Sequence, residues 1–139
     1  MNDHHVAYRT YLETLTPESL GRLEEYVSAD VRFTDPFNDV RGADAMRRVL
    51  SHMFDTVGPV VFRVSHMASD GDSCLMRWTF AGRLRGTDWT FAGMSTIRFN
   101  ADGLVYEHAD YWDGATALYE KLPVIGPVLA WIRRRIAVH

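Results

Sequence analysis

Hydrophobic residues in the first part of the chain recur every three or four positions, which is the spacing of helices with one buried face. This pattern covers residues 4–15, 17–29 and 43–57. Thr16 and Pro17 mark the start of the second segment, because Thr is a favoured N-cap residue and Pro fits the first helical turn. Ser19 lies at capping-box distance from Thr16. A short strand is predicted over residues 31–34, before the third helix.

From Val60 onward the hydrophobic period changes to two, which is the period of a strand with one buried face. Turn motifs rich in Gly, Asp and Asn interrupt this region at residues 69–72, 85–88 and 100–103. They divide it into four strands joined as hairpins. Helices followed by an antiparallel meander predict an α+β domain, in which a curved sheet wraps around the helices and leaves a pocket between them. Gly82 and Gly93 lie inside strand segments, where they either form the bulges or bends that curve the sheet or only relieve crowding.

The C-terminal segment, residues 122–137, differs from the rest of the chain. It combines an apolar run with Trp131 and three consecutive arginines, Arg133–Arg135, and is too short to span a bilayer. We predict an additional apolar and basic helix here. Three roles stay open: packing over the sheet or the pocket mouth with the arginines complementing the helix C-terminus, contact within a dimer, or binding at a membrane interface.

Composition limits the classes of function. With 139 residues, of which 47% are hydrophobic, the chain can form one domain with a substantial core. The net charge of −3, with no basic stripe through the body of the chain, argues against nucleic acid as a partner. The N-terminus has no secretory pattern, and the single cysteine, Cys74, is interpreted as a buried free thiol. We therefore expect a cytoplasmic protein.

The stretch Phe33-Thr34-Asp35-Pro36-Phe37 places a carboxylate among aromatic residues at the end of a strand. Pro36 biases Asp35 toward an extended backbone and ends the strand. Partial loss of water would raise the pKa of Asp35 toward the range of a general base. The alternative is that Asp35 only caps the turn or the following helix, since Asp-Pro is a common turn signal.

The last predicted strand, residues 104–112, puts four side chains on one face: Tyr106, His108, Asp110 and Trp112. If this face points into the pocket, Asp110 and His108 form an acid–base pair beside an indole ring. If it points outward, they are ordinary surface residues. A metal site needs three or four convergent ligands, which His52 or His66 could complete only by chance, so we expect no metal and no cofactor.

Several of these features together resemble the nuclear transport factor 2-like superfamily, and within it the ketosteroid isomerase and SnoaL-like polyketide cyclase branch. The resemblance extends over residues 6–113 and rests on Tyr11, the strand end Ala29–Pro36, Gly42 and the hairpin Ile97–Val105. It implies a single domain over residues 1–139, with a cone-shaped α+β barrel, a deep apolar cavity and a homodimer.

The resemblance also implies roles for individual residues. In ketosteroid isomerases the carboxylate of the Asp-Pro step moves the proton and a tyrosine of the first helix binds the oxyanion, and Asp35 and Tyr11 match these positions. The second oxyanion donor of those enzymes is a protonated Asp, and the matching residue here is Ser95, which is a weaker donor. SnoaL-like cyclases use a carboxylate of the last strand, which Asp110 with His108 resembles.

The sequence therefore predicts an enzyme that removes a proton next to a carbonyl group of an apolar substrate, with Asp110 or Asp35 as the base. Donors to the enolate oxygen are expected among Tyr11, Ser95 and His108. Substrate contacts are expected from apolar and aromatic side chains and from one hydroxyl: Phe33, Phe54, Trp78, Phe91, Trp112 and Ser95.

Two alternatives remain open at this point. One is a non-catalytic ligand-binding or dimerisation domain of the same fold, which needs the cavity but no reactive carboxylate. The other is an epoxide hydrolase, because limonene-type members of the superfamily resemble this chain and use an Asp-Arg-Asp set. Arg98 lies on the opposite alternation from Ser95 and Ile97, so we expect it outside the cavity, which weakens the second alternative.

Overall fold

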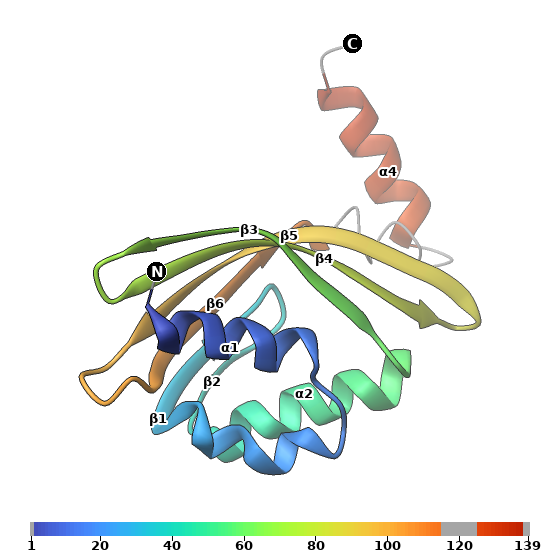
Figure 1. Cartoon of the computed structure of the whole chain (residues 1–139). Helices are drawn as coiled ribbons and strands as arrows, with labels where there is room; N and C mark the ends of the chain where they lie inside the picture. The colour runs from blue at the N-terminus through green and yellow to red at the C-terminus, as the bar shows by residue number, and fades with distance from the viewer. Residues whose placement is uncertain (1, 115–124, 138–139) are drawn as a thin grey trace.

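The computed structural model describes residues 2–114 and 125–137. Its elements are α1 (Asp3–Glu13), η1 (Ser19–Glu25), β1 (Val27–Thr34), β2 (Asp39–Arg41), α2 (Ala43–Val57), β3 (Val61–Asp70), β4 (Ser73–Leu84), β5 (Thr87–Phe99), β6 (Val105–Trp112) and α4 (Ile125–Ile136). The curved sheet arches over α1, η1 and α2, and α4 lies apart from it (Figure 1). The predicted α+β fold is confirmed.

Six strands form one sheet in the order β2-β1-β6-β5-β4-β3. Strands β3 to β6 form the predicted antiparallel meander, but β1 pairs with β6 in parallel, so the sheet is mixed. Val27 pairs with Val105, and such distant segments leave no local pattern in the sequence from which their pairing could be predicted. Strand β2 was not predicted because three residues are too few to show an alternation.

The spacing predicts one helix over residues 17–29, and this prediction is wrong. The segment contains the 3₁₀ helix η1, and β1 begins at Val27. The predicted boundary is confirmed, since Ser19 N donates to Thr16 Oγ1 at 3.1 Å and Thr16 N donates to Ser19 Oγ at 2.9 Å. The strand begins early because Val27 is fully buried and the next pairing bond, from Val105 N to Tyr26 O, spans 2.9 Å.

Gly82 and Gly93 do not form bulges. The register between β4 and β5 continues through both residues, and one shift lies instead between Val64 and His66. The alternative, relief of crowding, is confirmed: a Cβ atom on Gly93 would lie 2.5 Å from Cη2 of Trp78, and one on Gly82 would meet other side chains at 3.3 Å. The absence of a side chain at Gly93 makes room for the Trp78 indole.

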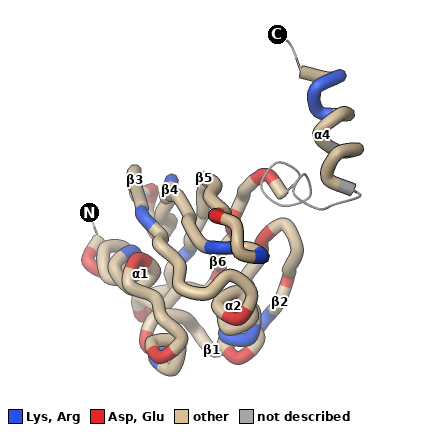
Figure 2. Tube along the Cα trace, turned by 90° about the vertical axis from the view of Figure 1, so that its right-hand side faces the viewer, with Lys and Arg blue, Asp and Glu red and all other residues tan. Residues whose placement is uncertain are grey.

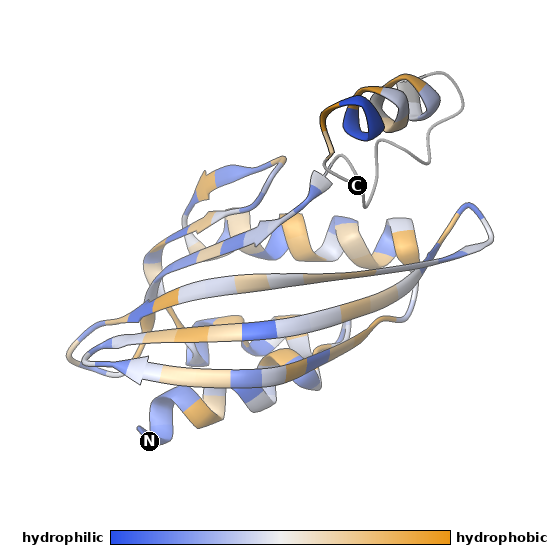
Figure 3. Ribbon diagram, turned by 90° about the horizontal axis from the view of Figure 1, so that it is seen from above, coloured by the Kyte–Doolittle hydropathy of each residue, from blue (hydrophilic) through white to orange (hydrophobic). Residues whose placement is uncertain are grey.

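The core lies between the helices and the inner face of the sheet. Hydrophobic and polar residues alternate along the strands, so one face of the sheet is apolar. Helices α1 and α2 lie behind the sheet in the view of Figure 3. The largest fully buried side chains come from both layers: Tyr8, Leu23, Met46, Met76 and Ile97. Cys74 is a buried free thiol, as predicted, and burial raises its pKa.

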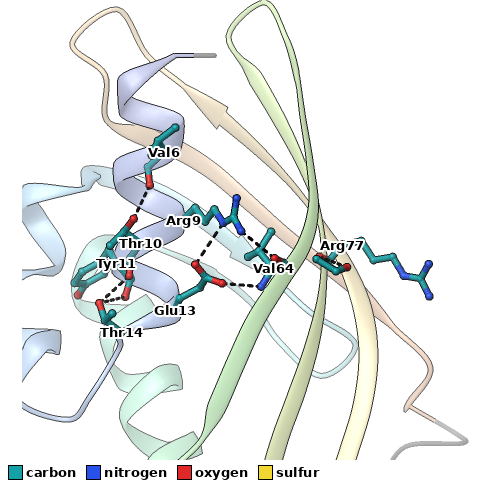
Figure 4. A network of polar contacts seen from close by, with 9 residues as sticks. Val6, Arg9, Thr10, Tyr11, Glu13, Thr14, Val64 and Arg77 are labelled. Atoms are coloured by element: carbon teal, nitrogen blue, oxygen red, sulfur yellow. Dashed lines mark hydrogen bonds and ion pairs between the residues drawn. The ribbon is translucent and has the colours of Figure 1, made fainter.

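Two side chains of α1 hold this helix to the edge strand β3. Arg9 Nη2 donates to Val64 O at 3.1 Å, and Val64 N donates to Glu13 Oε2 at 2.9 Å (Figure 4). Arg9 and Glu13 also pair with each other at 3.3 Å. These bonds satisfy the backbone of β3 beside its register shift, where the β4 ladder is interrupted. They fix α1, and with it Tyr8, against the sheet.

The predicted C-terminal helix is confirmed over Ile125–Ile136, and residues 122–124 of the prediction lie outside the described part. Four large apolar side chains of this helix are exposed: Val128, Trp131, Ile132 and Ile136. Its last turn carries three arginines (Figure 2), and the Arg135 guanidinium lies 5.4 Å from the Trp131 ring centre. No helix within residues 2–114 and 125–137 is long and apolar enough to cross a membrane. The surface that α4 contacts stays a prediction.

Candidate functional site

A cavity of about 470 Å³ lies under the sheet, and α2 forms its opposite wall. Eight aromatic side chains line it: Phe33, Phe37, Phe62, Trp78, Phe80, Trp89, Phe91 and Trp112. The polar lining consists of Asp35, Asn38, His52, Thr56, His108 and Asp110. The structure therefore has the hollow apolar interior that the sequence predicts, and both candidate carboxylates reach it.

The aromatic wall is centred on Phe91 of β5. Its ring centre lies 4.6 Å from that of Trp112, 4.8 Å from that of Trp89 and 4.9 Å from that of Phe80. Rings at such distances gain pairwise attraction beyond the burial of their area and keep each other in place. The wall is suited to a flat, apolar molecule.

Asp110, on β6, is held by one carboxylate oxygen. Oδ1 lies 2.7 Å from Nε2 of His108 and accepts a hydrogen bond of 2.5 Å from Oγ of Ser95. Behind Ser95 and His108, the Trp78 indole N–H donates to Ser95 Oγ at 2.8 Å, and the Tyr8 hydroxyl lies 2.7 Å from Nδ1 of His108. No side chain or amide in the described parts of the chain donates to Oδ2. Asp110 is thus anchored through Oδ1 and has Oδ2 uncommitted.

Burial changes steeply across this group. The His108 side chain is 5% exposed and that of Asp110 is 20% exposed, so the carboxylate lies where the buried network meets the open cavity. Tyr8 is fully buried, and its pKa is raised well above the ordinary value, first by burial and then by the negative charge of Asp110. The phenol of Tyr8 therefore stays protonated. The ring centre of Phe33 lies 5.3 Å from that of the His108 imidazole, and both side chains line the cavity.

Asp35 lines the same cavity but is bound within its own turn. Oδ1 accepts from the backbone N of Phe37 at 2.8 Å and of Asn38 at 2.7 Å. The Asn38 side-chain amide lies 3.0 Å from Oδ1 and 3.2 Å from Oδ2. The backbone of Asp35 and Asn38 closes the turn with a further bond of 2.9 Å. Asp35 therefore caps its own turn, and both of its oxygens have partners.

Tyr11 does not reach the cavity. Its hydroxyl donates to Ser19 O at 2.9 Å, and its ring stacks on that of Tyr26 with 4.1 Å between ring centres. Burial raises the pKa of Tyr11 to about 12. Because its O–H fixes the start of η1 against α1, it cannot also be aimed at an enolate oxygen. The role predicted for Tyr11 is therefore corrected to a structural one.

The predicted substrate contacts divide into two groups. Phe33, Trp78, Phe91 and Trp112 line the cavity. Phe54 is buried but does not line the cavity, and Ser95 lies behind Asp110 instead of facing a ligand.

Tyr8 was not predicted as a site residue. The helical spacing places it on the buried face of α1, as the structure confirms. Its partner, His108, lies 100 residues further along the chain, so no local pattern connects the two. The only available signal was that a buried Tyr usually needs a polar partner for its hydroxyl.

The other predicted alternatives were a metal site and an epoxide hydrolase set. The described residues contain no group of three or more side chains that could hold a metal ion. Arg98 is exposed and lies 5.2 Å from the ring centre of Tyr106, on the outer face of the sheet. Among the described residues that line the cavity there is no arginine, so the structure does not assemble an Asp-Arg-Asp set.

Comparisons with known proteins agree with this fold. The family model of the SnoaL-like domain matches residues 8–108. An epoxide hydrolase of M. tuberculosis, described as LEH-like, is 20% identical over 98% of this chain and 95% of its own, with a TM-score of 0.70. A Catenulispora acidiphila protein with a ketosteroid isomerase-like fold is 15% identical over 85% of this chain and 91% of its own, with a TM-score of 0.71.

A further solved structure, from Jannaschia sp., is assigned as a SnoaL-like polyketide cyclase. It is 14% identical over 88% of this chain and 92% of its own, with a TM-score of 0.71. No protein with a curated description matches the sequence. At these identities the solved structures show the fold and leave the reaction open.

Proposed function

The chain belongs to the SnoaL-like domain family, and we propose that it is an enzyme that removes a proton from the carbon next to a carbonyl group of an apolar small molecule. The observation that supports this proposal is the environment of Asp110. One of its oxygens accepts two hydrogen bonds, and the other oxygen has no partner in the described structure while the side chain lines an apolar cavity. A base needs both a fixed position and a free lone pair.

The chemistry that this geometry supports begins at Oδ2 of Asp110. This oxygen takes the proton from the α-carbon, and the electrons of the broken C–H bond move toward the carbonyl oxygen, which becomes an enolate oxygen. Asp110, now protonated on Oδ2, returns the proton to the α-carbon or, where the enolate is conjugated with a double bond, to the γ-carbon. Alternatively, the enolate carbon attacks a second carbonyl group, and the oxygen of that group takes the proton from Asp110. Apolar walls that exclude water strengthen every electrostatic contact with the developing charge.

The enolate oxygen needs a hydrogen-bond donor, and Trp112 takes this role in the proposal in place of Tyr11. Its indole lines the cavity, and the indole N–H donates to no group in residues 2–114 and 125–137. Trp112 follows Asp110 by two positions on the same face of β6. Such neighbours are about 7 Å apart along a strand, which leaves room for an α-carbon at one side chain and a carbonyl oxygen at the other.

The test uses 2-tetralone, a flat bicyclic ketone. Binding is followed by quenching of the cavity tryptophans, and proton removal by the incorporation of deuterium from D₂O at the α-carbon, recorded by ¹H NMR. We expect quenching together with exchange faster than in buffer, and an Asp110→Asn variant that still binds but exchanges at the buffer rate. A ketone that binds the wild type without faster exchange would favour the non-catalytic binding domain. Absence of binding would contradict both functions.

A further inference from the structure

We propose that Tyr8 is a positioning residue: its buried hydroxyl fixes the tautomer of His108, which then donates from Nε2 to Oδ1 of Asp110. The inference rests on the proposed role of Asp110 as the base. Tyr8 does not line the cavity and acts only through His108.

The direction of the first half of the network follows from Trp78. An indole nitrogen can only donate, so Ser95 Oγ is the acceptor of the 2.8 Å bond from Trp78. The single hydrogen of the Ser95 hydroxyl is then free to point at its other partner, Oδ1 of Asp110. This bond runs from serine to carboxylate without any assumption about His108.

The direction of the second half follows from Tyr8. Its side chain is fully buried, and its one described polar partner is Nδ1 of His108 at 2.7 Å. A buried hydroxyl hydrogen without an acceptor is costly, so the phenol donates and Nδ1 accepts. A neutral imidazole that accepts at Nδ1 carries its hydrogen on Nε2, which lies 2.7 Å from Oδ1 of Asp110.

The opposite tautomer fails at both ends of the imidazole. With the hydrogen on Nδ1, the Tyr8 hydrogen would have no acceptor among the described residues. The lone pair of Nε2 would also face the carboxylate oxygen at 2.7 Å, which places two acceptors in contact. The raised pKa of Tyr8 agrees with this direction, because burial and the charge of Asp110 favour the protonated phenol, which has a hydrogen to donate.

The consequence concerns the geometry of the base. Two donors on Oδ1 hold the carboxylate plane, and Oδ2 alone is directed to the ligand. The polar groups that face His108 are Tyr8 from α1 and Asp110 from its own strand, while β1 contributes the apolar ring of Phe33. Tyr8 is therefore the one of these two groups that can select the tautomer without being the base itself.

The experiment records the ¹⁵N resonances of the His108 ring at neutral pH in the full chain. We expect hydrogen on Nε2 and none on Nδ1 in the wild type. The same pattern should persist in Asp110→Asn, because an amide can pair with either tautomer and only Tyr8 then selects one. In the double variant Tyr8→Phe with Asp110→Asn, the pattern should change to a mixture of tautomers.

Tyr11→Phe is the matched control, because it removes the other buried hydroxyl of α1, which donates to Ser19 O. It should leave the His108 resonances unchanged. In the exchange assay, Tyr8→Phe should lower kcat by about tenfold with little change in KM, as expected for the loss of one hydrogen bond.

Two results would overturn the proposal: hydrogen on Nδ1 in the wild type, or a mixture of tautomers in Asp110→Asn alone. Both results come from spectra of the wild type and of Asp110→Asn without a ketone. They therefore test the proposal even if the variants that carry Tyr8→Phe do not fold. If the resonances agree with the proposal but no ketone exchanges, the tautomer assignment stands and the proposed reaction is wrong.

Discussion

Two carboxylates, those of Asp35 and Asp110, reach one cavity, and they differ in their hydrogen bonds. In the turn between β1 and β2, Asp35 accepts hydrogen bonds from two backbone amides and from the side chain of Asn38. On the wall formed by β5 and β6, Asp110 accepts bonds from two side chains at one oxygen only. Both side chains line the same apolar space. Their difference lies in which oxygen is left for a ligand.

The origin of the donors explains this difference. The donors to Asp35 lie two and three residues further along the chain, so the carboxylate is part of the turn that it caps. The donors to Asp110 are side chains, and behind them Tyr8 and Trp78 come from other elements. Asp35 therefore holds local structure, whereas Asp110 is held by the tertiary structure with one side free.

The largest expected effect separates the two acids by activity. Asp110→Asn should lower the rate of α-proton exchange in 2-tetralone by about 10²- to 10⁴-fold, which is the usual contribution of a positioned base. Asp35→Asn keeps an acceptor oxygen for the turn and should change the rate little. Both variants are compared with the wild type by ¹H NMR in D₂O. A large loss in Asp35→Asn with a small loss in Asp110→Asn would reverse the assignment.

The next effect concerns the donor on the same wall. Trp112→Phe keeps an aromatic ring against Phe91 but removes the indole N–H. Loss of one donor to a developing oxyanion typically raises the barrier by about 2.7 to 4 kcal/mol, so kcat should fall by about 10²- to 10³-fold. Fluorescence quenching by the ketone should persist. An unchanged kcat would show that another group binds the enolate oxygen.

The sequence predicted the cavity-facing side chains of β6 better than the hydrogen bonds behind them, in which Tyr8 and Trp78 take part. Alternation along the last strand correctly placed Asp110 and His108 on one face with Trp112, because side-chain direction in a strand follows from position alone. The strand end at Pro36 was equally local, and the two interpretations of Asp35 differed only in the direction of its carboxylate.

The remaining parts depended on contacts between distant segments. Tyr11 was assigned to the cavity by resemblance, but its hydroxyl is taken by Ser19 O, which only the packing of η1 shows. The parallel pairing of β1 with β6 and the contact of Tyr8 with His108 were missed for the same reason. Local periodicity contains no information about which distant residues meet.

A smaller effect sharpens the comparison by stability. Asp35→Ala removes the acceptor of two turn amides that are exposed or partly buried, and it should lower the free energy of unfolding by about 1 to 2 kcal/mol, the net value of the lost hydrogen bonds. Asp110→Asn keeps an acceptor for the Ser95 hydroxyl and should lower the free energy of unfolding by a smaller amount. Urea unfolding of both variants measures the difference, and equal losses would contradict the structural role of Asp35.

The smallest effect concerns Tyr11 and its pH dependence. Tyr11→Phe should cost about 1 kcal/mol at pH 8 through loss of its bond to Ser19 O. The pKa of Tyr11 is raised from 10.0 to about 12, so its contribution to stability is complete below pH 10 and is lost as the pH rises toward 12. The difference in the free energy of unfolding between the wild type and Tyr11→Phe should therefore shrink between pH 8 and pH 11, as measured by urea unfolding. A difference that grows with pH would contradict this assignment.

The most direct test of the central claim is a crystal structure of the protein with 2-tetralone in the cavity. The account predicts that the ketone's α-carbon lies about 3 to 3.5 Å from Oδ2 of Asp110, the distance of a reactive contact. Its carbonyl oxygen should lie toward the indole of Trp112. A ketone whose α-carbon lies instead against Asp35, or that binds with no carboxylate near it, would contradict the account.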